Sequence, residues 1–141
     1  MLLELLQIKF MSDSKHELGR EGEELAKEFY LKKGYKLVAQ NYYLYTSRQS
    51  GKIGEIDLIF ELSGKIYFVE VKTRSIYSVN KYGQASGQLR RSQLNSFFKT
   101  HHKFIKEFPE FKDSKLQYDF VFVQNGNIKV IPNALNFDSF Y

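Results

Sequence analysis

The sequence predicts a single α/β domain with one mixed β-sheet flanked by helices, in the order α-β-β-β-α-β-β. The prediction comes from two segments with helical apolar stripes and five strand-like segments bounded by turn residues. With 141 residues, the chain has the size of one ordinary domain with one hydrophobic core. Hydrophobic residues make up 43% of the chain and aromatic residues 16%, which excludes a disordered protein.

Capping residues define the two helices. The first is expected over residues 14–33, because a serine at its start and Glu17 form a capping box and Gly34 follows as a C-cap. The second is expected over residues 89–108, with phenylalanines at helical spacing along one face. Pro109 ends this helix, since proline cannot continue one.

Turn residues define five strands. They are expected at residues 35–45, 53–62, 65–73, 117–123 and 128–132. The second and third strands are joined by Ser63-Gly64. The fourth and fifth flank Asn125-Gly126, and Asn-Gly between two apolar runs is a strong signal for a hairpin with a two-residue turn.

The hairpin of the second and third strands holds the residues that point most strongly to a function. If these strands pair across Ser63-Gly64, Asp57 lies opposite Glu70 and Glu55 lies opposite Lys72. Opposed side chains are about 4.5–5.5 Å apart, so two facing carboxylates repel each other. A shared proton or a divalent cation would relieve that repulsion.

A plain ion pair between Glu55 and Lys72 is the alternative explanation. Both strands are apolar nearly throughout, as expected of strands covered on both faces, and charges in such strands rarely serve solubility. We therefore predict that Asp57 and Glu70 bind Mg²⁺ or Mn²⁺, which would polarise a phosphoryl group and lower the pKa of a bound water. Lys72 would orient that water and stabilise charge on phosphate oxygens.

Four sequence blocks resemble the YraN-like uncharacterised bacterial proteins. The specific pair is GEIDLI at 54–59 with FVEVKTR at 68–74, and the supporting blocks are GREGEELAKEFYLKKGY at 19–35 and QYDFVFV at 117–123. That family is assigned to the restriction-endonuclease-like (PD-(D/E)xK) superfamily and is similar in arrangement to Holliday-junction resolvases. The resemblance implies a restriction-endonuclease-like fold over nearly the whole domain.

The same resemblance implies a Mg²⁺-dependent endonuclease that hydrolyses phosphodiester bonds of DNA, with branched or single-stranded forms as candidate substrates. Carried over, Asp57 and Glu70 would bind the metal and Lys72 would act on the attacking water. Glu23 on the first helix would complete the acidic site. Taken alone, Glu23 would be read as one of several solvated glutamates near the helix start, where they favour the helix dipole.

Two further residues belong to the candidate site as supporting residues, Glu55 and Gln93. Gln93 occupies a position early in the second helix where the family often has a lysine. An uncharged residue there favours the alternative function, a non-catalytic nucleic-acid-binding protein that keeps the nuclease fold. A third, less favoured function is an interaction module whose acidic hairpin binds a structural cation.

Positive charge is concentrated late in the chain. The net charge is +5, and residues 81–106 contain six basic residues and no acidic one. We expect nucleic acid, and DNA above all, as the partner. The residues expected to contact it are Arg90, Arg91, Lys99, Lys103 and Lys106. A merely solvated helix face is the alternative. Neither a membrane nor a small-molecule cofactor is expected, and a homodimer is left open.

Several functional classes are excluded by composition. The chain contains no cysteine, which excludes disulfides, a cysteine-ligated zinc and a thiol nucleophile. His101 lies on the apolar face of the second helix and is expected in the core, so we expect no zinc. Residues 1–11 are expected to be an extension, either a short docked helix or the product of a misassigned start. They lack the features of a signal peptide, and the nuclease-like domain at 12–141 is expected in the cytoplasm.

Overall fold

A computed structural model describes residues 15–45, 52–73 and 91–134. It confirms the predicted α/β domain and the order of its elements. The elements are α2 (Lys15–Lys32), β1 (Lys36–Tyr45), β2 (Lys52–Leu62), β3 (Lys65–Thr73), α4 (Arg91–Glu107), the 3₁₀ turn η1 (Pro109–Phe111), β4 (Leu116–Gln124) and β5 (Asn127–Ile131). The turn η1 was not predicted, and the expected extension at 1–11 lies outside the described residues.

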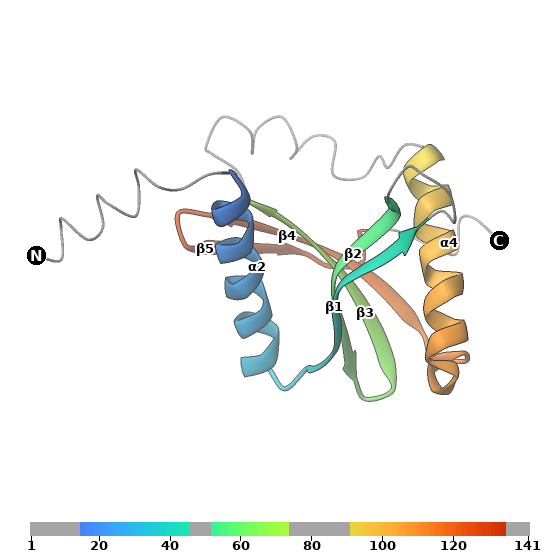
Figure 1. The fold of residues 1–141 in the computed structure, drawn as a ribbon. Helices are drawn as coiled ribbons and strands as arrows, with labels where there is room; N and C mark the ends of the chain where they lie inside the picture. Colours follow the sequence, from blue (N-terminus) through green and yellow to red (C-terminus); the bar gives the residue numbers. More distant parts are fainter. Residues whose placement is uncertain (1–14, 46–51, 74–90, 135–141) are drawn as a thin grey trace, which may run out of the picture.

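The five strands form one mixed sheet in the order β1-β2-β3-β4-β5. Only the pair β3–β4 is parallel, because the chain crosses from β3 through α4 before it returns as β4. The other three neighbouring pairs are antiparallel. Figure 1 shows α2 and α4 on opposite sides of the sheet, so the molecule has three layers.

Each face of the sheet has its own hydrophobic core. The α4-side core consists of Tyr42, Ile56, Ile59, Ile66, Phe68, Phe97, Phe104, Tyr118, Phe120 and Phe122. The α2-side core consists of Ala26, Tyr30, Leu58, Phe60, Val69, Val121 and Val123. The central strands are therefore covered on both faces, as predicted for the apolar hairpin. His101 also packs where its position predicts, with its ring stacked on Phe97 at 6.4 Å between centroids.

Both hairpin turns have the predicted two-residue form. Ser63 and Gly64 have φ values of 50° and 80°, and Asn125 and Gly126 have 51° and 78°, as the twist of antiparallel strands requires. Glu61 supports the first turn, since its Oε1 accepts a hydrogen bond from the N–H of Gly64 at 3.0 Å. The β2–β3 register from Leu62↔Lys65 to Leu58↔Val69 is the predicted one.

A buried carboxylate holds α2 against the sheet. Asp119 of β4 is 3% exposed, and its Oδ2 accepts a hydrogen bond of 2.8 Å from the hydroxyl of Tyr30 on α2. Its Oδ1 accepts bonds from the side chain of Gln117 at 2.8 Å and from the N–H of Asn133 at 3.0 Å. The network fixes one helix, one strand and the turn after β5 to a single side chain.

Gly22 marks the closest approach of α2 to β3. A Cβ at this position would overlap with Oγ1 of Thr73 and would lie 3.2 Å from its Cβ. Oγ1 of Thr73 is buried, and it has no hydrogen-bond partner among the described residues. Gly22 therefore sets the spacing between the start of α2 and the end of β3.

We expect Gly22→Ala to lower the free energy of unfolding by about 1–3 kcal/mol, although alanine is the better helix former, because the added methyl overpacks the contact with Thr73. Thr73→Ala should relieve most of that loss in the double variant. Gly19→Ala is the matched control on the same helix, since a Cβ there has nothing within 4 Å, and it should stabilise slightly. Urea unfolding of the four variants measures these changes, and equal effects at the two glycines would contradict the close approach.

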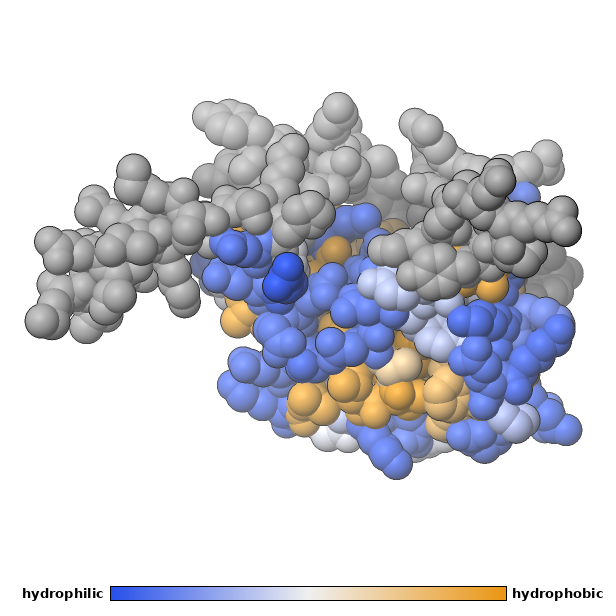
Figure 2. All heavy atoms as spheres, viewed as in Figure 1, coloured by the Kyte–Doolittle hydropathy of each residue, from blue (hydrophilic) through white to orange (hydrophobic). Residues whose placement is uncertain are grey.

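The described part of the molecule has a largely hydrophilic surface in the view of Figure 2. Apolar residues gather low in that view, near the turn that joins β2 and β3 in Figure 1. Among the described residues, neither helix has the length and apolar character needed to cross a membrane.

Candidate functional site

The two hairpin strands separate beyond the Leu58–Val69 pair. The backbone register ends there, and the N–H of Val71 donates a hydrogen bond to Oδ2 of Asp57 at 2.8 Å. Figure 1 shows the ends of β2 and β3 diverging, β2 toward α4 and β3 toward the start of α2. The side chain of Asp57, and not the backbone of β2, therefore accepts the hydrogen bond from β3 at the point where the two strands separate.

An irregularity in β2 brings Asp57 to this point. Ile56 and Ile59 are three positions apart, yet both belong to the α4-side core. Because neighbouring residues of a regular strand alternate between faces, the alternation must switch between them. The facing strand β1 is irregular at the same level, where Asn41 has a φ of 50°. Asp57 lies in the segment where the alternation switches, and its side chain accepts the hydrogen bond from Val71 of β3.

Glu70 and Lys72 of β3 complete the centre of the site. Lys72 Nζ lies 3.0 Å from Oε1 of Glu70, and the two side chains are 32% and 20% exposed. Asp57 is 8% exposed. The structure thus brings together the two predicted metal ligands and the predicted catalytic lysine, partly open to solvent.

The pKa values of the two central carboxylates are raised by burial and by neighbouring negative charge. Burial, followed by the charge of Glu70, raises the pKa of Asp57 to about 7. Burial also raises the pKa of Glu70, against the opposing effect of Lys72 and with smaller contributions from Glu55 and Glu23. Lys72 lowers the pKa of both Asp57 and Glu70, but burial and the neighbouring carboxylates outweigh it, so the site favours binding of a proton or a cation.

The donor atoms suit a hard divalent cation. Carboxylate oxygens are the ligands that Mg²⁺ and Mn²⁺ prefer. Within the described ranges, no three His, Asp or Glu side chains form a ready-made metal cluster. Asp57 and Glu70 would therefore supply two ligands, and water or phosphate oxygens would supply the others, which is a common arrangement for Mg²⁺.

The remaining predicted site residues fall into two groups. Glu23 on α2 and Glu55 on β2 both lie near enough to raise the pKa of Glu70. Arg90 lies outside the described residues, and so do the side chains of Arg91 and Gln93. The roles expected of Arg90, Arg91 and Gln93 therefore stay predictions.

The described lysines of α4 differ in their surroundings. Lys99 and Lys106 are exposed. Lys103 instead donates a hydrogen bond of 2.6 Å to the carbonyl oxygen of Tyr43, and its Nζ lies 4.6 Å from the ring centroid of Tyr42. Lys103 joins α4 to β1, a structural role that its place in a basic run did not indicate.

Tyr118 is a site residue that sequence reasoning missed. It is buried on β4, and its pKa is raised by burial and then by the carboxylates of Glu70 and Asp57. The sequence shows only a tyrosine in an apolar strand, because the parallel register that aligns Tyr118 with Phe68 has no local signal.

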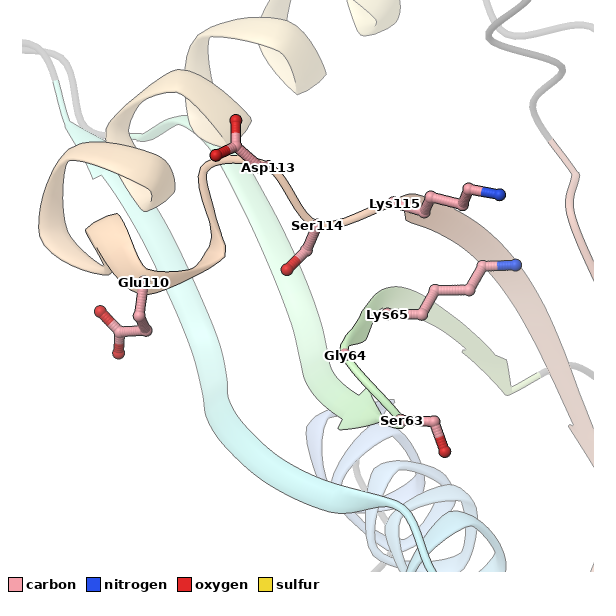
Figure 3. A pocket seen from close by; sticks show the side chains of 7 residues that line it. All are labelled: Ser63, Gly64, Lys65, Glu110, Asp113, Ser114 and Lys115. Atoms are coloured by element: carbon pink, nitrogen blue, oxygen red, sulfur yellow. The ribbon is translucent and has the colours of Figure 1, made fainter.

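A hollow at the turn end of the hairpin is separate from the acidic site. Figure 3 shows its lining residues, which are Ser63, Gly64, Lys65, Glu110, Asp113, Ser114 and Lys115. None of them belongs to the acidic site. Lys65 is engaged there with Oε1 of Gln117 at 2.6 Å, so the hollow is a surface feature of the fold.

Comparison with known proteins identifies relatives of uncharacterised function. The family model described as "Uncharacterised protein family UPF0102" matches residues 22–123. A UPF0102 protein of Natranaerobius thermophilus is 35% identical over 109 residues, which cover 77% of this chain and 84% of that protein. A UPF0102 protein of Syntrophomonas wolfei is 32% identical over 116 residues (81% and 91%), and one of Persephonella marina is 28% identical over 120 residues (85% and 94%). These names state no activity.

Proposed function

The chain belongs to the uncharacterised protein family UPF0102, and from its acidic site we propose that it is a metal-dependent endonuclease that hydrolyses phosphodiester bonds of DNA. The observation that carries the proposal is the pair Asp57 and Glu70, two carboxylates of raised pKa, with Lys72 hydrogen-bonded to Glu70. Clustered groups with perturbed pKa values are typical of catalytic sites. The restriction-endonuclease-like superfamily, which the sequence resembles, uses the same residue types.

Each side chain has a distinct role in this proposal. A bound divalent cation would polarise the phosphoryl group and lower the pKa of a bound water. Asp57 is oriented through one oxygen by the N–H of Val71, and Glu70 through one oxygen by Lys72, so both carboxylates have a fixed direction. Lys72 orients the attacking water and stabilises the negative charge that develops on phosphate oxygens.

Cleavage assays test the activity directly. Labelled duplex, single-stranded and branched DNA are incubated with the purified protein in Mg²⁺, in Mn²⁺ and in EDTA. We expect cutting that requires the metal. If no substrate is cut but DNA is still bound, the function is that of a non-catalytic nucleic-acid-binding protein, which the basic run in α4 would serve equally well.

The nucleic-acid surface can be tested through salt dependence. We expect Lys99→Gln and Lys106→Gln each to lower the slope of log Kd against log salt by about one, because each exposed lysine contacts one phosphate. Lys103→Gln is the matched control, since that lysine is engaged with β1 and should change thermal stability more than slope. Fluorescence anisotropy in EDTA measures the slopes. If Lys99→Gln and Lys106→Gln keep the slope of the parent protein, this face of α4 does not contact nucleic acid.

A further inference from the structure

The strands β1 and β2 change the face to which their side chains point at the same level of the sheet. In β2, Leu58 belongs to the α2-side core and Ile56 to the α4-side core. Residues two apart in a regular strand share a face, so β2 switches faces between these two positions. The residue between them is Asp57.

The edge strand β1 makes the same switch. Oε1 of Gln40 accepts a hydrogen bond of 3.4 Å from Nζ of Lys27 on α2, so this side chain lies on the α2 side of the sheet. Tyr42, two positions further on, belongs to the α4-side core. The residue between Gln40 and Tyr42 is Asn41.

The two switches depend on each other, because β1 and β2 are paired on both sides of them. The flanking pairs keep one register and are Gln40↔Leu58 and Tyr42↔Ile56. Directly opposed residues of an antiparallel pair share a face of the sheet. The strand β2 can therefore leave its alternation at Asp57 only if β1 does so at the opposite residue, which is Asn41.

The backbone of Asn41 has a conformation suited to such a switch. Its φ is 50°, in the left-handed region that glycine and asparagine tolerate better than other residues. Beyond the switch, the start of β2 runs against α4, where a Cβ on Gly54 would overlap with Oγ1 of Thr100. At the switch, the side chain of Asp57 accepts the hydrogen bond from Val71 of β3 at 2.8 Å.

We propose that Asn41 is a positioning residue, whose left-handed backbone turns Asp57 toward β3 in the orientation in which Asp57 and Glu70 share one divalent cation. The proposal rests on the proposed function. The side-chain amide of Asn41 has no part in the chemistry. A ligand has to be held within about 0.5 Å of its productive position, so a small rotation of the facing strand is enough to weaken the site.

Asn41→Ala and Asn41→Gly test the proposal as a pair. Both remove the side-chain amide, but alanine disfavours a positive φ and glycine accepts it. We expect Asn41→Ala to bind Mn²⁺ about tenfold more weakly in a calorimetric titration, the lower end of the loss typical of residues that orient metal ligands. Its cleavage rate should fall at low Mn²⁺ and recover at saturating Mn²⁺. Asn41→Gly should match the parent in both measurements.

Asn125→Ala is the matched control. Asn125 has a φ of 51° at the tip of the β4–β5 hairpin, which β3 separates from β2. Both alanine variants should therefore lower the midpoint of thermal unfolding to a similar extent, but Asn125→Ala should bind Mn²⁺ as the parent does. An equal loss of Mn²⁺ affinity in the two variants would mean that Asn41 acts only through overall stability, and would overturn the proposal.

Asp57→Asn separates the proposal from the function on which it rests. If Asp57→Asn binds Mn²⁺ as tightly as the parent, the metal site is refuted, and the proposal with it. If Asp57→Asn loses binding but Asn41→Ala keeps it, only the role of Asn41 is refuted. Weak binding in Asn41→Gly would also refute that role, because the side chain and not the backbone would then support the site. If Asn41→Ala does not fold, Asn41→Ser replaces it under the same outcomes, since serine stands in for asparagine only weakly at such positions.

Discussion

Asp57→Asn is expected to abolish metal-dependent cleavage while making the metal-free protein more stable. The loss of activity follows from the loss of a ligand charge, and we expect a fall of about 10²-fold or more. The gain in stability follows from the environment of Asp57, where burial and the charge of Glu70 disfavour the ionised carboxylate. An asparagine oxygen can still accept the hydrogen bond from Val71.

The stability gain should depend on pH in a defined direction. The pKa of Asp57 is about 7 in the folded protein and about 3.9 in an unfolded chain, so between these values the folded state holds a proton that the unfolded state has released. Stability therefore falls as pH rises from about 4 to 7. Asp57→Asn removes this dependence, so its advantage should be on the order of 2–4 kcal/mol at pH 8 and absent near pH 4.

Thermal unfolding in EDTA at pH 4, 6 and 8 measures the effect, and Asp119→Asn provides the contrast. Asp119 is also buried, but its carboxylate accepts three hydrogen bonds, so its amide replacement should destabilise the fold at neutral pH. If both variants change stability in the same direction at pH 8, Asp57 is an ordinary carboxylate whose ionised form is stabilised by its hydrogen bonds. The site would then have lost its main electrostatic signature.

Lys72→Met is expected to separate binding from chemistry. Methionine keeps the apolar stem and deletes the ammonium that now lies 3.0 Å from Glu70. We expect Mn²⁺ affinity at pH 8 to stay within about threefold of the parent or to increase, because both carboxylate ligands remain. The cleavage rate should fall about 10²-fold or more, since the lost charge acts on the transition state.

Lys65→Met is the control for Lys72→Met on the same strand. Its ammonium bonds to Gln117 near the hairpin turn, away from the acidic site, so the parent rate should persist. Rates and Mn²⁺ titrations of both variants decide the matter. Parent activity in Lys72→Met would reduce that lysine to an ion-pair partner of Glu70 and remove the proposed third catalytic residue.

Local sequence signals were sufficient for most of the fold. Ser63-Gly64 and Asn125-Gly126 adopt the turn conformations that fix two hairpin registers, and turn geometry is a local property. The same register placed Asp57 near Glu70. It did not reveal that the strands separate there, because a register assumes that regular pairing continues. Asn41, with its positive φ, marks the irregularity, and nothing in an apolar strand pattern predicts it.

Contacts between distant elements were beyond sequence reasoning. Lys103 looked like one basic residue among several on α4, but its bond to the carbonyl of Tyr43 depends on how α4 crosses β1. Tyr118 comes near Glu70 only through the parallel pairing of β3 with β4. Such contacts follow from tertiary packing, and a single sequence carries little information about it.

The mixed sheet also implies an order of assembly. The β2–β3 hairpin closes through a two-residue turn, so Asp57 and Glu70 can meet through local contacts that form within microseconds. The parallel β3–β4 pair must close a segment of roughly 40 residues, at an entropic cost of about 3 kcal/mol. High contact order of this kind slows folding. The acidic pair can therefore form while β4 is still far away, and docking of β4 is the step that covers the open edge of β3 beside Glu70.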